Sequence, residues 1–166
     1  MWAGMAALGV ASLVAPAGGA ERHPVQVRVQ LTRHRVTAGV AIRGTVVVTN
    51  TTRKPITVDY CLADGWLLVE LTSPTVPAAF AHPAVACPPS LRLRPGVNRF
   101  SVTVSTHAAM CVVPGGQSRV PTPQCTAEGT PPPLPPGSYR TAVDIEGLAG
   151  LAGTPDAVRV DVLPAS

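Results

Sequence analysis

The sequence contains few aromatic and few charged side chains. Aromatic residues make up 4% of its 166 residues and charged residues 13%. Proteins that read nucleic acids usually stack bases on aromatic side chains, so this shortage argues against a nucleic-acid partner. The hydrophobic fraction of 46% is in turn too large for an intrinsically disordered chain.

The sequence also lacks the short motifs that carry much of enzyme chemistry. It contains no nucleophile elbow of the Gly-x-Ser-x-Gly type, no phosphate-binding P-loop and no dinucleotide-binding glycine fingerprint. The four histidines are scattered along the chain, at His23, His34, His82 and His107. We therefore predict no catalytic residue, no cofactor and no enzymatic activity.

Long helices are not expected either, because proline and glycine are abundant. The chain has 19 Pro and 15 Gly, together about a fifth of all residues. That fraction is high for a helical protein and too low for collagen or a low-complexity chain. The length suits one domain with one hydrophobic core.

The first twenty residues have the layout of a secretory signal peptide. Residues 1–20 carry no charged side chain, the apolar run extends from Trp2 to Val14, and the small residues Gly18 and Ala20 precede the first charge at Glu21. The run is shorter than the roughly 20 residues of a spanning helix, which disfavours the alternative of a retained anchor. We predict a signal peptide over 1–20, a secreted or extracytoplasmic domain over 21–166, and no stable membrane span once the signal is removed.

Four cysteines in an exported chain predict two disulfides. The residues are Cys61, Cys87, Cys111 and Cys125. Four cysteines allow three connectivities, and the spacing favours the neighbouring pairs Cys61–Cys87 and Cys111–Cys125. The alternative is a metal carrier that uses His107 with a free Cys111, or His82 with Cys87. No Cys-x-x-Cys or His-x-x-x-His pair accompanies these residues, so we predict no metal.

Apolar and polar residues alternate with a period of two along the mature chain, which predicts β-strands. The expected strands cover residues 25–31, 42–50, 56–60, 66–71, 91–93, 100–104, 139–145 and 158–162. The run 66–71 is apolar almost throughout, which favours a central strand covered on both faces. Gly44 lies inside a strand and predicts a bulge or a close approach of another segment.

Seven or eight short strands joined by turns predict an all-β fold. We expect an immunoglobulin-like antiparallel β-sandwich of about seven strands, with a barrel as the alternative. Two long proline-rich loops, 72–90 and 105–137, interrupt the strands, and both contain or adjoin cysteines. Binding residues concentrate on long loops, so these segments are the candidate sites. The alternative is that the disulfides only restrain poorly packed insertions.

The order of several short motifs resembles a known family. These motifs are the run 44–52, the run 55–58, Leu93-x-Pro95-Gly96, Phe100-x-Val102-x-Val104 and Pro136-Gly137-Ser138-Tyr139. Together they resemble bacterial secreted immunoglobulin-like domains of the CARDB type. The resemblance implies a sandwich fold and places Tyr139 as the corner tyrosine that follows a Pro-Gly turn.

Basic residues are frequent near the start of the mature chain. Between residues 21 and 60 they are Arg22, Arg28, Arg33, Arg35, Arg43, Arg53 and Lys54, opposed by Glu21 and Asp59. We interpret this region as a solvated face, and the alternative is a patch that meets an anionic cell-wall polymer or a lipid headgroup.

Taken together, these features predict a secreted, non-catalytic immunoglobulin-like module that binds an unknown protein or a cell-envelope polymer. The alternative function is a secreted protease inhibitor that acts through one proline-rich loop.

Overall fold

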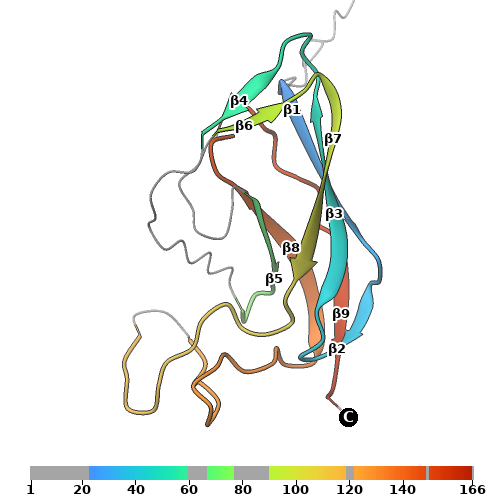
Figure 1. The fold of residues 1–166 in the computed structure, drawn as a ribbon. Helices are drawn as coiled ribbons and strands as arrows, with labels where there is room; N and C mark the ends of the chain where they lie inside the picture. The colour runs from blue at the N-terminus through green and yellow to red at the C-terminus, as the bar shows by residue number, and fades with distance from the viewer. Residues whose placement is uncertain (1–22, 60–66, 77–89, 119–121, 149, 166) are drawn as a thin grey trace, which may run out of the picture.

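The computed structural model describes residues 23–59, 67–76, 90–118, 122–148 and 150–165. Within these segments the regular structure consists of β-strands alone (Figure 1). The strands are β1 (Val25–Leu31), β2 (Arg35–Thr37), β3 (Ile42–Asn50), β4 (Ile56–Val58), β5 (Leu67–Thr72), β6 (Leu91–Leu93), β7 (Gly96–Val104), β8 (Gly137–Ile145) and β9 (Arg159–Leu163). In these segments there is no helix of the length and hydropathy needed to cross a membrane.

The strands form two main sheets that pack face to face. One sheet has the order β1-β3-β7 and is antiparallel throughout. The other has the order β2-β9-β8-β5, in which only the pair β2 and β9 is parallel. A small third sheet joins β4 to β6. The predicted all-β sandwich is confirmed.

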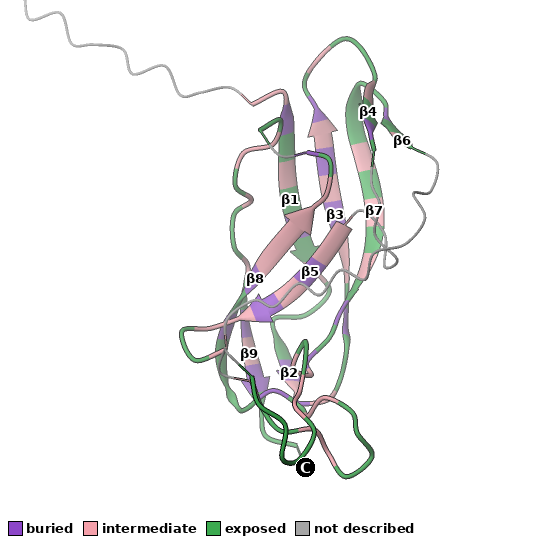
Figure 2. Cartoon of the chain, turned by 90° about the vertical axis from the view of Figure 1, so that its left-hand side faces the viewer, coloured by how far each residue is buried: buried purple, intermediate pink, exposed green. Residues whose placement is uncertain are grey.

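The core lies between the two main sheets. Alternate side chains of each strand point into it, and Figure 2 shows the resulting bands of buried residues along β3 and of exposed residues along β7. Ile42, Val46 and Val48 on β3 are fully buried, as are Val104 on β7 and Val160 on β9. Burial of each such side chain contributes about 1.5–3 kcal/mol to folding.

The strand order is that of an immunoglobulin-like sandwich. In such domains the first two strands and the fifth share one sheet, and the third, sixth and seventh share the other. Here β1, β3 and β7 take the first set of places, while β5, β8 and β9 take the second. The hydroxyl of Tyr139 donates a hydrogen bond of 2.7 Å to the carbonyl oxygen of Pro135, four residues upstream. This contact has the geometry of the tyrosine corner found in that fold.

Two details differ from the sequence prediction. The strand β5 lies at an edge of its sheet among the described residues, where it pairs only with β8, so the expectation of a central strand was wrong. Its side chains are nonetheless buried or half-buried on both faces. An apolar run therefore indicates that both faces are covered, whatever place the strand takes in its sheet. The sequence did not predict β2, whose three residues include a single buried side chain, Val36.

At Gly44 the sequence predicted either a bulge or a close approach of another segment, and the structure shows the close approach. Its neighbours in the ladder are Leu31 and Val102, and the pairing of β3 continues without interruption on both sides, which excludes a bulge. A Cβ atom at this position would lie 2.8 Å from the carbonyl oxygen of Gln30 and 2.8 Å from Cδ2 of Leu31. Glycine is therefore required because β1 approaches closely.

Candidate functional site

The outer face of the β1-β3-β7 sheet carries the candidate site. Because side chains alternate across a strand, the residues that do not enter the core face outward from this sheet. On β1 these are Gln26, Arg28 and Gln30, all exposed. On β7 they include Val97 and Arg99, also exposed.

The register of the strands arranges these residues in rows across the sheet. Arg28 pairs with Val47 of β3, and Val47 pairs with Arg99 of β7, so one valine separates two arginines in a single row. The next row consists of Gln26, Thr49 and Val97. Two cationic side chains, from β1 and β7, thus lie on either side of the apolar side chain of Val47.

The connection between β8 and β9 builds a wall along the free side of β1. Its residues Ala152 and Asp156 form isolated parallel bridges with Val25 and Arg28, and the amide of Val25 donates to the carbonyl oxygen of Leu151 at 3.1 Å. The ring of His23 packs closely on Gly153, since a Cβ atom there would lie only 2.9 Å from Cδ2 of His23.

The sheet face and this wall enclose a groove of about 610 Å³. That volume lies within the range of about 300–1,000 Å³ that is common for ligand sites. The described residues that line the groove are His23, Val25, Gln26, Val27, Arg28, Gln30, Val47, Thr49, Val97, Arg99, Gly153, Thr154 and Asp156.

The charge of this lining is predominantly positive. Arg28 and Arg99 face a single carboxylate, Asp156, among the described lining residues. Within the described segments neither arginine forms an ion pair shorter than 4 Å; the pair found there joins Arg159 and Asp161 at 3.2 Å, on the other sheet. The two guanidinium groups therefore remain available to an anionic ligand.

The side chains of the groove offer several hydrogen-bonding groups. The described lining contains glutamine and threonine side chains, one histidine and one acidic residue, and no serine, cysteine or aromatic side chain. Recognition at this surface would rest on charge and on hydrogen bonds, because the described lining contains no Phe, Tyr or Trp side chain on which a ligand could stack.

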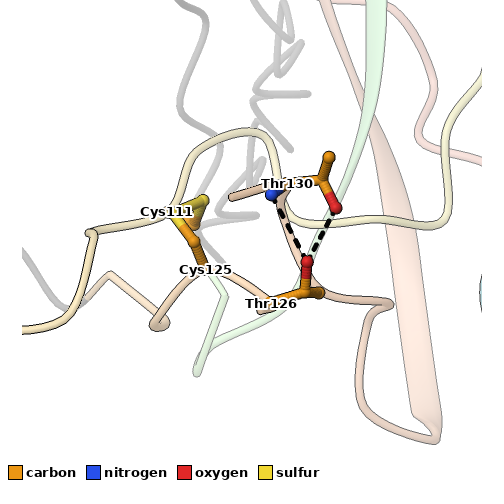
Figure 3. The surroundings of a disulfide bond; sticks show 4 residues. All are labelled: Cys111, Cys125, Thr126 and Thr130. Atoms are coloured by element: carbon orange, nitrogen blue, oxygen red, sulfur yellow. Dashed lines mark hydrogen bonds between the residues drawn. A yellow bond between two sulfur atoms is a disulfide. The ribbon is translucent and has the colours of Figure 1, made fainter. Parts of the chain in front are cut away.

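The loop 105–137 forms a separate lobe at the end of the sandwich where β7 leads into β8 (Figure 1). A disulfide joins Cys111 to Cys125 with their Cα atoms 4.9 Å apart, which confirms this predicted pair (Figure 3). Beside it, the hydroxyls of Thr126 and Thr130 lie 2.9 Å apart and share a hydrogen bond. The lobe thus has local order but, within its described part, no strand.

The disulfide also excludes one of the two metal sites considered from the sequence. A cysteine in a disulfide has no thiolate to offer, so the metal carrier built on His107 and a free Cys111 is excluded. The ring of His107 instead lies 3.7 Å from the position of a Cβ atom on Gly39. The other candidates, Cys61, Cys87 and His82, lie outside the described residues, as does the predicted signal peptide over 1–20.

The basic residues between 21 and 60 lie on different parts of the fold and do not form one patch among the described residues. Arg28 and Arg43 lie on the outer face of the β1-β3-β7 sheet, whereas Arg35 lies on β2 of the other sheet. Arg53 and Lys54 lie in the turn between β3 and β4. The groove therefore combines one member of this region, Arg28, with Arg99 of β7, which lies outside residues 21–60.

The described groove differs from the site that the sequence predicted, which was the two proline-rich loops. None of its described lining residues comes from 72–90 or 105–137. The outward position of Gln26, Arg28 and Gln30 was readable from the period of two, but the neighbour of each strand was not. Only the register shows that Arg28 and Arg99 share a row.

Comparisons with known proteins give no family for this chain. No family model matches it, and no curated protein matches its sequence. Among solved structures, a beta-glucosidase from Listeria innocua in complex with glucose matches 83% of this chain with 11% sequence identity and a TM-score of 0.41. The match spans 16% of the length of that enzyme. At this TM-score the likeness carries no inference about activity.

Proposed function

We propose that the chain is an exported, non-catalytic binding module of the cell envelope that holds its ligand in the groove on the β1-β3-β7 sheet. The observation that carries this proposal is the groove itself, with two unpaired arginines among the described residues over an apolar and hydrogen-bonding floor. The immunoglobulin-like sandwich supports it, because its sheets provide a rigid base for the lining side chains. The Cys111–Cys125 disulfide is in keeping with export, because such bonds persist in oxidising compartments.

Blocking the groove tests the binding function. Val47 lies on its floor, so Val47→Trp would fill the space, while Ser138→Trp adds the same bulk on an exposed position of the other sheet. We expect the chain over 21–166 to co-sediment with isolated cell envelopes, Val47→Trp to abolish this, and Ser138→Trp to leave it unchanged. Absence of co-sedimentation, or equal binding by a folded Val47→Trp variant, would refute the proposed site.

Export is tested separately. When the full chain is expressed in a bacterium, we expect its mature form in the extracytoplasmic fraction, starting at Glu21 by N-terminal sequencing. Recovery of only the uncleaved chain from the cytoplasm would contradict the export part of the proposal.

A second candidate function, protease inhibition, is favoured by one observation in the lobe. The Cys111–Cys125 disulfide closes a loop with a sequence separation of 14, in which Val113 is 61% exposed. A loop closed by a disulfide loses less conformational entropy on binding a protease than an open loop does. An inhibitory loop needs this low entropic cost in order to bind tightly. A panel of secreted proteases tests this idea, and lack of inhibition at micromolar concentrations of the chain would dismiss it.

A further inference from the structure

The groove has features that specify the chemistry of its ligand, and this step rests on the binding function proposed above. We infer that the ligand is a hydroxyl-rich linear polymer bearing repeated oxyanion groups, either phosphate or carboxylate, and that Arg28 and Arg99 hold those groups.

The position of the two arginines suits the binding of anions. They occupy one row of the sheet with Val47 between them, so their backbones lie two strand spacings apart, about 10 Å. Two long side chains at this separation can close on one anion from both sides or hold two successive anions of a chain. Guanidinium groups suit this role because they bind phosphate or carboxylate oxygens in pairs.

The charge of the groove complements an anionic ligand. Both arginines are exposed, and neither is neutralised by an ion pair shorter than 4 Å within the described residues. The one acidic side chain of the described lining, Asp156, belongs to the wall beside β1. A ligand that enters the groove therefore meets a net positive surface, which favours an anion over a neutral or cationic molecule.

The hydrogen-bond donors of β1 are evenly spaced along the strand. Gln26, Arg28 and Gln30 point outward from β1 at intervals of two residues, about 7 Å apart. They form a line along the strand, and Thr49 adds a hydroxyl in the row of Gln26. Such a line of donors suits a polymer that repeats hydrogen-bonding groups between its anions better than it suits an isolated small ion.

The experiment measures binding of the chain over 21–166 to immobilised polymers. The probes are poly(glycerol phosphate) and polygalacturonate, with neutral dextran as the uncharged control and phosphatidylglycerol vesicles as a lipid surface. We expect at least one polyanion to bind, dextran not to bind, and affinity to fall as salt is added. Which polyanion binds distinguishes the phosphate from the carboxylate source.

Variants that each remove one positive charge distinguish a specific binding site from general electrostatic attraction of the polyanion to the protein. Arg28→Ala and Arg99→Ala should each weaken polyanion binding at least about 10-fold, the loss expected for a charge-assisted hydrogen bond. Arg43→Ala removes the same charge from the same sheet face outside the described lining, and should change affinity less than twofold. Arg28→Lys keeps the charge without the paired donors, so its loss should fall between these values.

Several outcomes would overturn the inference. Equal losses for Arg28→Ala and Arg43→Ala would show attraction by net charge alone, and arginine-dependent binding of vesicles without polymers would assign the surface to lipid. If Val47→Trp abolishes envelope binding but the double variant Arg28→Ala, Arg99→Ala does not, the ligand class is wrong and the binding function stands. If neither variant affects envelope binding, both proposals fail.

Discussion

The sandwich and the lobe between β7 and β8 obtain their order in different ways. In the sandwich, β3 and β7 pair over nine residues each, and the core side chains include many that are fully buried. In the described part of the lobe, one disulfide, isolated bridges such as Val112 with Gln124, and local hydrogen bonds replace the ladder. The contrast shows how a proline-rich insertion can be ordered without a core of its own.

The two regions meet at a small buried junction. Thr106 and Leu134, at the two ends of the lobe, are both buried, and the amide of Leu134 donates to the carbonyl oxygen of Thr106 at 2.8 Å. The hydroxyl of Thr106 in turn donates to the carbonyl oxygen of Val40 at 3.0 Å. The base of the lobe therefore belongs to the sandwich, whereas residues such as Val113 are exposed to solvent.

The largest effect is expected from the core of the sandwich. Ile42→Ala removes a fully buried side chain from β3 and should lower the free energy of unfolding by about 2–5 kcal/mol, because a cavity adds to the lost burial. Val113→Ala truncates an apolar side chain in the lobe that is 61% exposed, and should change stability by less than about 0.5 kcal/mol. Chemical denaturation of both variants measures the difference, and similar losses would contradict the comparison.

An intermediate effect is expected from the disulfide. Replacing Cys111 and Cys125 by Ser together should cost at most about 3 kcal/mol, the entropy of closing a loop of this size. Because the lobe has its own contacts, hydrogen exchange should accelerate at the amides of Val112 and Gly116 and stay unchanged in β3. Faster exchange in β3 as well would mean that the lobe and the sandwich unfold as one unit.

A smaller effect than that of the disulfide is expected at Tyr139, near the junction. Tyr139→Phe removes the hydrogen bond to Pro135 and should cost about 0.5–1.5 kcal/mol at neutral pH. Burial raises the pKa of Tyr139 above its ordinary value of 10.0. As the pH rises past 10, the hydroxyl of Tyr139 therefore loses its proton in the unfolded chain before it does so in the native state, and the free energy of unfolding decreases. The cost of the substitution should therefore shrink as the pH rises above 10.

Denaturation of both proteins near neutrality and above pH 10 measures this change. A cost that stays constant or grows with pH would show that the neutral hydroxyl of Tyr139 is not favoured by the fold.

Much of the fold was predictable from the sequence because alternation is a local signal. Phe100, Val102 and Val104 point inward from β7 as the period of two predicts. Tyr139 lies near the start of β8, after the Pro-Gly turn, and its hydroxyl donates to the carbonyl oxygen of Pro135. The signal fails where a strand is too short to alternate, as in β2. It also fails where a run is apolar on both faces, as in β5, since such a run does not indicate a place in the sheet.

The candidate site was less predictable, for a physical reason. Its groove lies on a sheet face, while the sequence directed attention to the loops 72–90 and 105–137. The sequence by itself determined which side chains of each strand face solvent, because that depends on the backbone of the strand alone. Only the tertiary structure decided that Arg28 and Arg99 flank the same valine, because strand order and register arise from hydrogen bonds between segments far apart in the chain.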